Sequence, residues 1–247
     1  MKFYRRLMPF KAISFDLDDT LYSNGPVMAG IEQKMISHFA QLMPQYKQIF
    51  NSAFWFYFKQ QAIKQQSELA HDVVFSRLES YCLGFISLGF TEEAARSHAQ
   101  TALEYFIQLR SEFKVPEKSQ QLLAKLSEKL PLVAISNGNV NTETLGIGKY
   151  FTHIYHAGYQ QVIDNSPVKG TLLRQKPEKD MFVDVCKKLA ILPEELLHVG
   201  DCGNADIYGA LSAGCQAVFL PHYGVGKPLK VIPHLELNDV CDLEKLI

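Results

Sequence analysis

Carboxylates crowd the end of a short apolar run near the N-terminus, where Asp16, Asp18 and Asp19 follow one another closely. In an extended segment, side chains two residues apart project to the same side, so Asp16 and Asp18 can address one point. Crowded carboxylates repel one another unless a proton or a cation relieves the repulsion. Mg²⁺ prefers a few carboxylates together with substrate phosphate and water. The spacing therefore favours a Mg²⁺ site that acts on a phosphorylated ligand.

Three later segments carry residue types that suit the same chemistry. A hydroxyl and backbone N–H groups at Ser136 and Asn137 can hold phosphoryl oxygens. Lys176 precedes an expected helix start, where its charge would strengthen an anion site. Asp201 and Asp206 add carboxylates after a further apolar run. Each segment is common by itself, but together, in this order and each after a strand, they would lie at the one rim where open α/β sheets bind ligands.

The elements that must position these residues are short runs rich in Val and Ile, which alternate with helical patterns. Five runs have the length and composition of strands covered on both faces: Ala12–Leu17, Pro131–Ser136, His153–Ala157, Leu196–Gly200 and Cys215–Leu220. Helical patterns lie between them, at Lys118–Lys129, at Glu178–Leu189 opened by Pro177, and at Ala205–Ala213. This alternation predicts an α/β, doubly wound parallel-sheet (Rossmann-like) core. The polar residues above would then share the sheet edge where such folds bind ligands.

Residues 22–116 differ from the rest of the chain in their sequence pattern, because their apolar side chains recur at helical spacing. Ile31, Met35, Phe39 and Leu42 form one such stripe. We expect a bundle of about four helices inserted over 22–116, and a core made of residues 1–21 and 117–247. The five consecutive aromatic residues at 54–58 fit either a helix packed on two sides or an apolar wall beside a ligand.

Composition limits the classes of partner. A formal net charge of −1 gives no general attraction to nucleic acid or to an anionic membrane, and no stretch approaches the roughly 18 apolar residues of a membrane span. The 5 cysteines are scattered and odd in number, which fits a reducing compartment. We expect a cytoplasmic protein that is a monomer or weak homodimer; composition leaves a small anionic ligand open, and the motif resemblance described next implies a small phosphorylated metabolite.

The four segments together resemble the motifs of the haloacid dehalogenase superfamily of phosphohydrolases over nearly the whole chain. The first motif reads Asp16-Leu17-Asp18-Asp19-Thr20; the others are Ser136, Lys176, and Gly200-Asp201 through Asp206. The inserted helices resemble that family's helical cap. The resemblance implies the strand order 5-4-1-2-3 for the five runs given above.

The resemblance also implies a role for each motif residue. Asp16 would attack phosphorus to form an aspartyl-phosphate, and Asp18 would act as general acid and then as general base. Asp16, the backbone carbonyl of Asp18 and Asp201 would hold Mg²⁺. Phosphoryl oxygens would bind Ser136, the Asn137 N–H and Lys176, while Thr20 and Asp206 would orient their neighbours.

Further similarity points to the bacterial FMN phosphatase branch. It lies in the segment from Asp16 through Asn24, in His71-Asp72-Val73, and in Arg110 ahead of Val115-Pro116. FMN or a related sugar phosphate would then be the substrate, and Arg77 and Arg110 are candidates for substrate contact or cap closure. The segment 159–175 is longer than expected for that branch and is interpreted as a loop that leans over the mouth of the site.

Other activities on the same fold stay open at this point. A dehalogenase would not be expected to keep Asp18. A phosphomutase would return the phosphoryl group to its own substrate, so only product analysis separates it from a hydrolase. A phosphoryl switch would gain nothing from a leaving-group acid or from a large cap. A binding protein would turn over no phosphomonoester at all.

Overall fold

A computed structural model describes residues 1–160 and 170–247. The chain divides into two compact units: a core unit, Met1–Asn24 with Lys114–Ile247, and a helical unit, Gly25–Phe113. The sequence places the inserted helices at 22–116, and the structure begins and ends the helical unit a few residues further in. Each unit is described by itself.

The core unit contains a seven-stranded sheet. Its strands are β1 (Lys2–Phe3), β2 (Ala12–Phe15), β3 (Leu132–Ser136), β4 (His153–His156), β7 (Leu196–Gly200), β8 (Gln216–Phe219) and β9 (Leu235–Glu236). The order across the sheet is β1-β9-β8-β7-β2-β3-β4, with every pair parallel except β1 with β9. The predicted order 5-4-1-2-3 is confirmed, and β9 and β1 extend the sheet beyond it.

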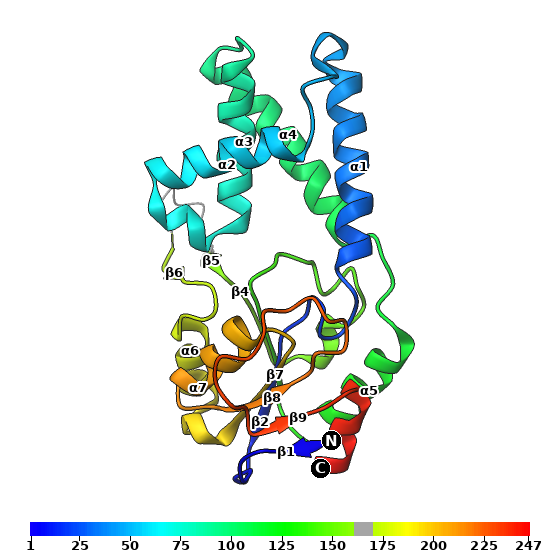
Figure 1. Cartoon of the computed structure of the whole chain (residues 1–247), viewed down its shortest axis with the longest axis vertical. Coiled ribbons are helices and arrows are strands. Elements are labelled where there is room, and N and C mark those ends of the chain that lie inside the picture. The colour runs from blue at the N-terminus through cyan, green and yellow to red at the C-terminus, as the bar shows by residue number, and fades with distance from the viewer. Residues whose placement is uncertain (161–169) are drawn as a thin grey trace. The chain divides into compact units, whose positions relative to one another are not determined.

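Helices cover both faces of this sheet, which is why β2, β3 and β7 are buried along their whole length. On one face lie α6 (Asp180–Leu189), the π-helical turn η5 (Gly203–Tyr208) and α7 (Gly209–Ser212). On the other face lie α5 (Glu117–Ser127) and the 3-10 segment η6 (Val240–Leu246) (Figure 1). The doubly wound α/β core is therefore confirmed.

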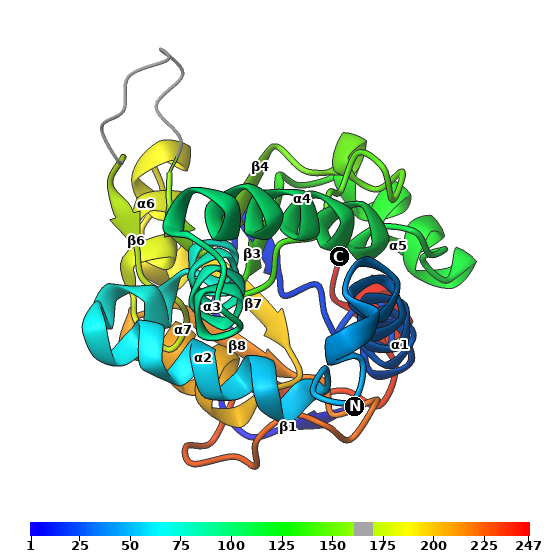
Figure 2. The ribbon, with the colours of Figure 1, turned by 90° about the horizontal axis from the view of Figure 1, so that it is seen from above.

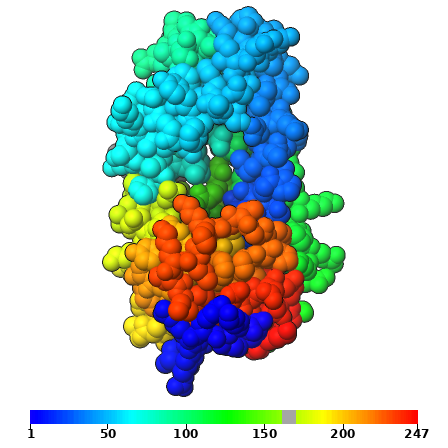
Figure 3. Space-filling model, in the orientation of Figure 1, coloured from blue at the N-terminus to red at the C-terminus, as the bar shows by residue number. Residues whose placement is uncertain are grey.

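An N-terminal strand, β1, forms one edge of the core sheet. Figure 3 shows the N-terminal segment beside the C-terminal residues, and the Tyr4 hydroxyl donates to Glu236 Oε2 at 2.6 Å. The pairing of β1 with β9 fixes this edge.

Two predicted helix starts were wrong. The helix expected from Pro177 begins at Asp180. The residues before this helix form a separate turn, in which the Glu178 N–H donates to Gln175 O at 3.0 Å. The Arg174 guanidinium also donates hydrogen bonds to the Asp180 carboxylate at the start of the helix. The helix expected from Ala205 starts earlier, as the π-helical turn η5.

A small antiparallel pair, β5 (Gly158–Tyr159) with β6 (Leu172–Leu173), belongs to the segment interpreted as a loop over the site mouth. Residues 161–169 of that segment lie outside the described residues, so the interpretation stays a prediction.

The helical unit consists of α1 (Gly25–Leu42), α2 (Ser52–Gln65), α3 (Val73–Ser87) and α4 (Glu92–Arg110), with 3-10 turns at Pro44–Tyr46 and Ser67–His71. Side chains of Asn51, Asp72 and Thr91 cap the N-termini of α2, α3 and α4 by accepting backbone N–H bonds. Figure 2 shows α3 between α2 and α4, with which it packs.

The apolar stripe predicted for the first of these helices is largely confirmed. Ile31, Met35 and Phe39 are buried, but Leu42 is 50% exposed because α1 ends there. Across both units, no described helix combines the length and the apolar character needed to cross a membrane.

Candidate active site

Asp16 stands at the carboxyl end of β2, which lies between β7 and β3 in the sheet. Its backbone N–H donates to Val199 O at 2.9 Å, which continues the pairing of β2 with β7 by one residue. The side chain is 11% exposed. The Thr20 hydroxyl faces Asp16 Oδ2 at 3.4 Å, because the chain turns back after Leu17. The loop thus brings Thr20 to the carboxylate that the sequence selects as nucleophile.

Lys176 is buried beside Asp16, with 1% of its side chain exposed. Its ammonium group lies 2.6 Å from Asp16 Oδ1, 2.6 Å from Asp206 Oδ1 and 2.7 Å from Ile135 O. These contacts use all three ammonium donors. Asn137 fixes the backbone of Lys176, since Oδ1 accepts from the lysine N–H at 2.8 Å and Nδ2 donates to its carbonyl at 2.9 Å.

This placement corrects one prediction. Lys176 does not stand at a helix N-terminus, because α6 begins four residues later. The Lys176–Pro177 peptide bond is cis, and the side chain reaches the ends of β2 and β3 instead. Its positive charge therefore lies at the carboxyl ends of β2 and β3 rather than at the N-terminus of a helix.

The shared ammonium group sets the protonation of this cluster. Burial opposes the charge of Lys176, but Asp16 and Asp206 outweigh it and hold the lysine pKa above its usual value. Burial also works against Asp206, yet Lys176 and His198 keep its pKa low. For Asp16, burial and the nearby Asp206 charge prevail over Lys176 and raise the pKa. Burial is thus the largest influence on the Asp16 pKa, and Lys176 offsets it only in part.

A buried chain of polar groups supports Asp206. His198 Nε2 lies 3.2 Å from Asp206 Oδ1, and His198 Nδ1 lies 2.9 Å from Ser14 Oγ. The Cys202 N–H donates to Asp206 Oδ2 at 2.9 Å. Burial lowers the pKa of His198, so its neutral ring donates to Asp206 and accepts from Ser14.

The sequence predicts His198 to be a core histidine with satisfied hydrogen bonds, and that prediction is confirmed. Its support of Asp206 was missed. The signal was available, because Ser14 and His198 each interrupt an apolar run, and the predicted order makes those runs neighbours. In the structure the two residues are register partners.

Asp201 follows β7 at the same edge of the sheet. Burial, followed by repulsion from Asp206 and Asp19, raises its pKa to about 7. The segment at Gly226 packs directly on it: a Cβ at that position would lie 2.3 Å from Asp201 O and 2.5 Å from Asp201 Oδ2. The Gly203 N–H also donates to Lys227 O at 2.7 Å. The sequence did not predict that residues 226 and 227 pack on the Asp201 segment, because a glycine has no side chain that would indicate such a contact.

The acidic cluster has the chemistry of a divalent-cation site. Carboxylate oxygens of Asp16, Asp201 and Asp206 all lie within 4.8 Å of one another. Asp206 is already engaged by Lys176, His198 and Cys202. Asp16 and Asp201 are the two with raised pKa values, and a nearby cation would lower both. Hard oxygen donors of this kind fit Mg²⁺.

The other predicted core residues lie in the turns after β2 and β3. The Asp18 carboxylate accepts from the Tyr22 hydroxyl at 2.8 Å. Ser136 is fully buried, and its Oγ accepts from the Gly138 N–H at 2.9 Å, which leaves its O–H available to donate.

Arg77 and Arg110 belong to the helical unit. The Arg77 guanidinium carbon lies 3.6 Å from the centroid of the Phe106 ring, and Nη1 lies 3.4 Å from the Tyr81 hydroxyl. Arg110 is 2% exposed at the last turn of α4. A role in substrate contact stays a prediction for both.

This geometry agrees with comparisons to known proteins. A family model for haloacid dehalogenase-like hydrolases matches residues 10–214. Because the match spans most of the chain, the protein belongs to the haloacid dehalogenase-like hydrolases. A solved 2-haloacid dehalogenase from Pseudomonas syringae is similar in fold, with a TM-score of 0.82 at 22% identity, covering 96% of this chain and 97% of that one.

Comparison with two curated relatives narrows the class of enzyme. The chain is 33% identical over 251 residues, 100% of each protein, to the 5-amino-6-(5-phospho-D-ribitylamino)uracil phosphatase YigB of Escherichia coli (strain K12). It is 25% identical to the phosphoglycolate phosphatase of Chromobacterium violaceum, over 98% of each chain. With the family match, these similarities identify the protein as a phosphatase of the haloacid dehalogenase-like type.

Proposed function

We propose that the protein is a Mg²⁺-dependent phosphomonoester hydrolase that acts through an aspartyl-phosphate on Asp16. The observation that carries this proposal is the position of the Asp16 carboxylate at the end of β2, hydrogen-bonded to Lys176 and within 4.8 Å of a carboxylate oxygen of Asp201. A carboxylate nucleophile, a fixed cation and a second carboxylate together can receive a phosphoryl group. The helical unit is proposed to act as the cap.

In the first step, the Asp16 carboxylate attacks phosphorus while the bond to the leaving oxygen breaks. Asp18 gives its proton to that oxygen, so the alcohol leaves neutral. In the second step, water attacks phosphorus and Asp18 accepts the water proton. The acyl-phosphate bond then breaks, which releases inorganic phosphate and restores Asp16. Tyr22, whose hydroxyl donates to Asp18 at 2.8 Å, holds the acid in place.

Asp16, Asp201 and the Asp18 backbone carbonyl would hold Mg²⁺, which would screen the repulsion between a carboxylate nucleophile and an anionic substrate. Ser136 would donate its O–H to a phosphoryl oxygen, together with the Asn137 N–H. Lys176 would stabilise the equatorial charge, and Asp206 and Thr20 would position Lys176 and Asp16.

For the substrate, we propose a phosphate ester on a ribityl chain that is attached to a nitrogen heterocycle. The name of the Escherichia coli relative describes such a compound, a uracil with a 5-phospho-D-ribitylamino group. FMN, expected from the motif resemblance, carries its phosphate on a ribityl chain as well. Both present a primary phosphomonoester at a distance from a planar ring.

A panel of phosphomonoesters tests this proposal. FMN, pyridoxal phosphate, nucleotides and sugar phosphates would be incubated with the protein and Mg²⁺, and inorganic phosphate and organic products would be measured. We expect phosphate release, with ribityl phosphates among the best substrates by kcat/KM. An isomerised substrate without free phosphate would instead identify a mutase, and no turnover of any ester would refute hydrolysis.

A further inference from the structure

The turn after β3 carries two groups that the proposed function assigns to phosphate, and His156 of β4 contacts this turn. Ser136, the last residue of β3, and His156, the last residue of β4, are register partners in neighbouring parallel strands. His156 Nδ1 lies 2.9 Å from Gly138 O. The phosphoryl chemistry proposed for the core unit assigns no part to this histidine.

The contact with Gly138 fixes which ring nitrogen of His156 carries a proton. A carbonyl oxygen only accepts hydrogen bonds, so His156 Nδ1 is the donor. Both the neutral Nδ1–H tautomer and the charged ring have that proton, so either form can make the bond. The backbone adds a second contact, because the Ala157 N–H donates to Ser136 O at 3.0 Å. The end of β4 therefore holds the turn at both Ser136 and Gly138.

Two other sets of hydrogen bonds hold the same turn. Within the turn, the Gly138 N–H donates to Ser136 Oγ at 2.9 Å. From the segment before α6, the backbone of Lys176 exchanges two hydrogen bonds with the Asn137 side chain, at 2.8 and 2.9 Å. Both sets leave Gly138 O to other donors, and His156 supplies one. The side chain of His156 thus secures the last residue of the turn.

From this geometry we propose that His156 is a positioning residue for phosphate binding. The Ser136 O–H and the Asn137 N–H must both face phosphoryl oxygens, and both belong to the turn whose last carbonyl His156 holds. A misplacement of about 1 Å can cost ~10²-fold in rate, so a contact that fixes the turn should matter to phosphate binding and turnover. This inference rests on the proposed function for the role of the turn.

Inorganic phosphate is the probe, because the turn would bind this part of any phosphomonoester and its binding needs no turnover. Its affinity is measured by calorimetry on the full-length protein with saturating Mg²⁺. Asparagine places an amide nitrogen at the same number of bonds from Cα as histidine Nδ1, whereas glutamine places it one bond further. We expect His156→Leu and His156→Gln to bind phosphate at least about tenfold more weakly, and His156→Asn to remain close to the wild type.

Two controls separate positioning from a general loss of structure. His153→Leu removes the other histidine of β4, whose ring faces Tyr155 at 6.5 Å between centroids, and should bind phosphate as the wild type does. Mg²⁺ alone should bind His156→Leu as it binds the wild type, because the proposed ligands Asp16 and Asp201 follow β2 and β7. Circular dichroism and thermal melting check folding. If His156→Leu does not fold, the comparison of His156→Asn with His156→Gln decides.

The inference is overturned if the wild type binds no phosphate, if His156→Leu and His156→Gln bind it like the wild type, if His156→Asn is as weak as His156→Gln, or if Mg²⁺ affinity falls together with phosphate affinity. Turnover of p-nitrophenyl phosphate with Mg²⁺ is measured in parallel. Turnover by the wild type, with unchanged phosphate affinity in every His156 variant, would refute the positioning role alone. Phosphate binding that depends on His156, without turnover of any phosphomonoester, would refute the proposed function alone.

Discussion

At the scale of single residues, the site depends on one buried ammonium group shared by two carboxylates. Lys176 stabilises Asp206 as a carboxylate, and Asp206 in turn is held by His198 and Cys202. At Asp16, burial and the Asp206 charge outweigh Lys176 and raise the pKa, which a nearby cation would lower. In the proposed function, Asp206 therefore positions Lys176, and the reactivity of Asp16 depends on Mg²⁺.

Asp18→Asn should separate the two half-reactions. The asparagine keeps the backbone carbonyl proposed to bind Mg²⁺ but cannot donate a proton to the leaving oxygen, a contribution of typically ~10²–10⁴-fold. An aryl phosphate, whose leaving group needs little help, should still phosphorylate Asp16. We expect one burst of aryl product per active site, followed by slow turnover, and no comparable burst with an alkyl phosphate. Equal loss of the first step for both esters, without a trapped phosphoenzyme, would mean that Asp18 is not the acid–base group.

His198 should make the stability of the fold depend on pH. Burial lowers the pKa of His198 in the folded state, whereas the unfolded chain binds a proton near the ordinary value of about 6.5. Unfolding therefore takes up a proton below that pH, and this contribution to the free energy of unfolding falls as pH falls, by at most ~1.4 kcal/mol per unit.

Urea unfolding across a range of about pH 8 to 5 tests this linkage. His198→Asn should show a shallower loss of stability toward low pH than the wild type. Ser14→Ala, which removes the other hydrogen-bond partner of the ring, should be less stable but keep the wild-type slope. Identical slopes in wild type and His198→Asn would contradict the assignment of a neutral buried ring.

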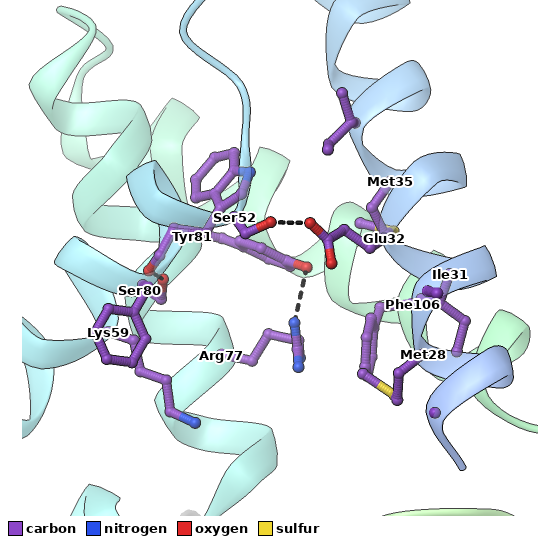
Figure 4. A pocket seen from close by; sticks show the side chains of 15 residues that line it. Met28, Ile31, Glu32, Met35, Ser52, Lys59, Arg77, Ser80, Tyr81 and Phe106 are labelled. Carbon is purple, nitrogen blue, oxygen red and sulfur yellow. Dashed lines mark hydrogen bonds between the residues drawn. The ribbon is translucent and has the colours of Figure 1, made fainter. Parts of the chain in front are cut away.

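At the scale of elements, the strands were predictable and several supporting contacts were not. Apolar runs that end in polar residues identify β2, β3 and β7, and the motif order implies their neighbours. The helix start at Asp180 was not predicted correctly. A helix tolerates proline at its first position, but a proline does not require a helix to begin there. The helical unit also contains a cavity lined in part by Trp55, Phe56 and Arg77 (Figure 4). The sequence predicted it only as one of two interpretations of residues 54–58, because it depends on how four helices pack, which helical periodicity does not encode.

The segment at Gly226 should hold the carboxylate of Asp201, a proposed Mg²⁺ ligand, in position. Gly226→Ala would place a Cβ 2.5 Å from Asp201 Oδ2, so the loop or the carboxylate must move. Changes beside a metal ligand typically weaken metal affinity ~10- to 100-fold, and we expect a loss of at least about tenfold for Mg²⁺ by calorimetry. Gly30→Ala, where a Cβ meets nothing within 4 Å, serves as the matched control. Unchanged Mg²⁺ affinity in Gly226→Ala would exclude this role.

At the scale of the whole molecule, we propose that the two units have different roles. The core unit would carry the groups that react with any phosphomonoester, and the helical unit would select the substrate as a cap. If Arg77 contacts the substrate, Arg77→Ala should lower kcat/KM for FMN by a larger factor than for p-nitrophenyl phosphate, because the aryl ester offers a much smaller group to contact. Steady-state kinetics on both esters measure the two factors, and equal factors would place Arg77 outside substrate selection.

The most direct test of the central claim is phosphate release from FMN and from p-nitrophenyl phosphate, with Mg²⁺ and with excess chelator. We predict turnover of both esters with Mg²⁺, loss of turnover in chelator, and recovery when Mg²⁺ is restored. Asp16→Asn should abolish turnover at every Mg²⁺ concentration, since the amide cannot act as the nucleophile. Full turnover in excess chelator, or by Asp16→Asn, would contradict a Mg²⁺-dependent hydrolase that acts through Asp16.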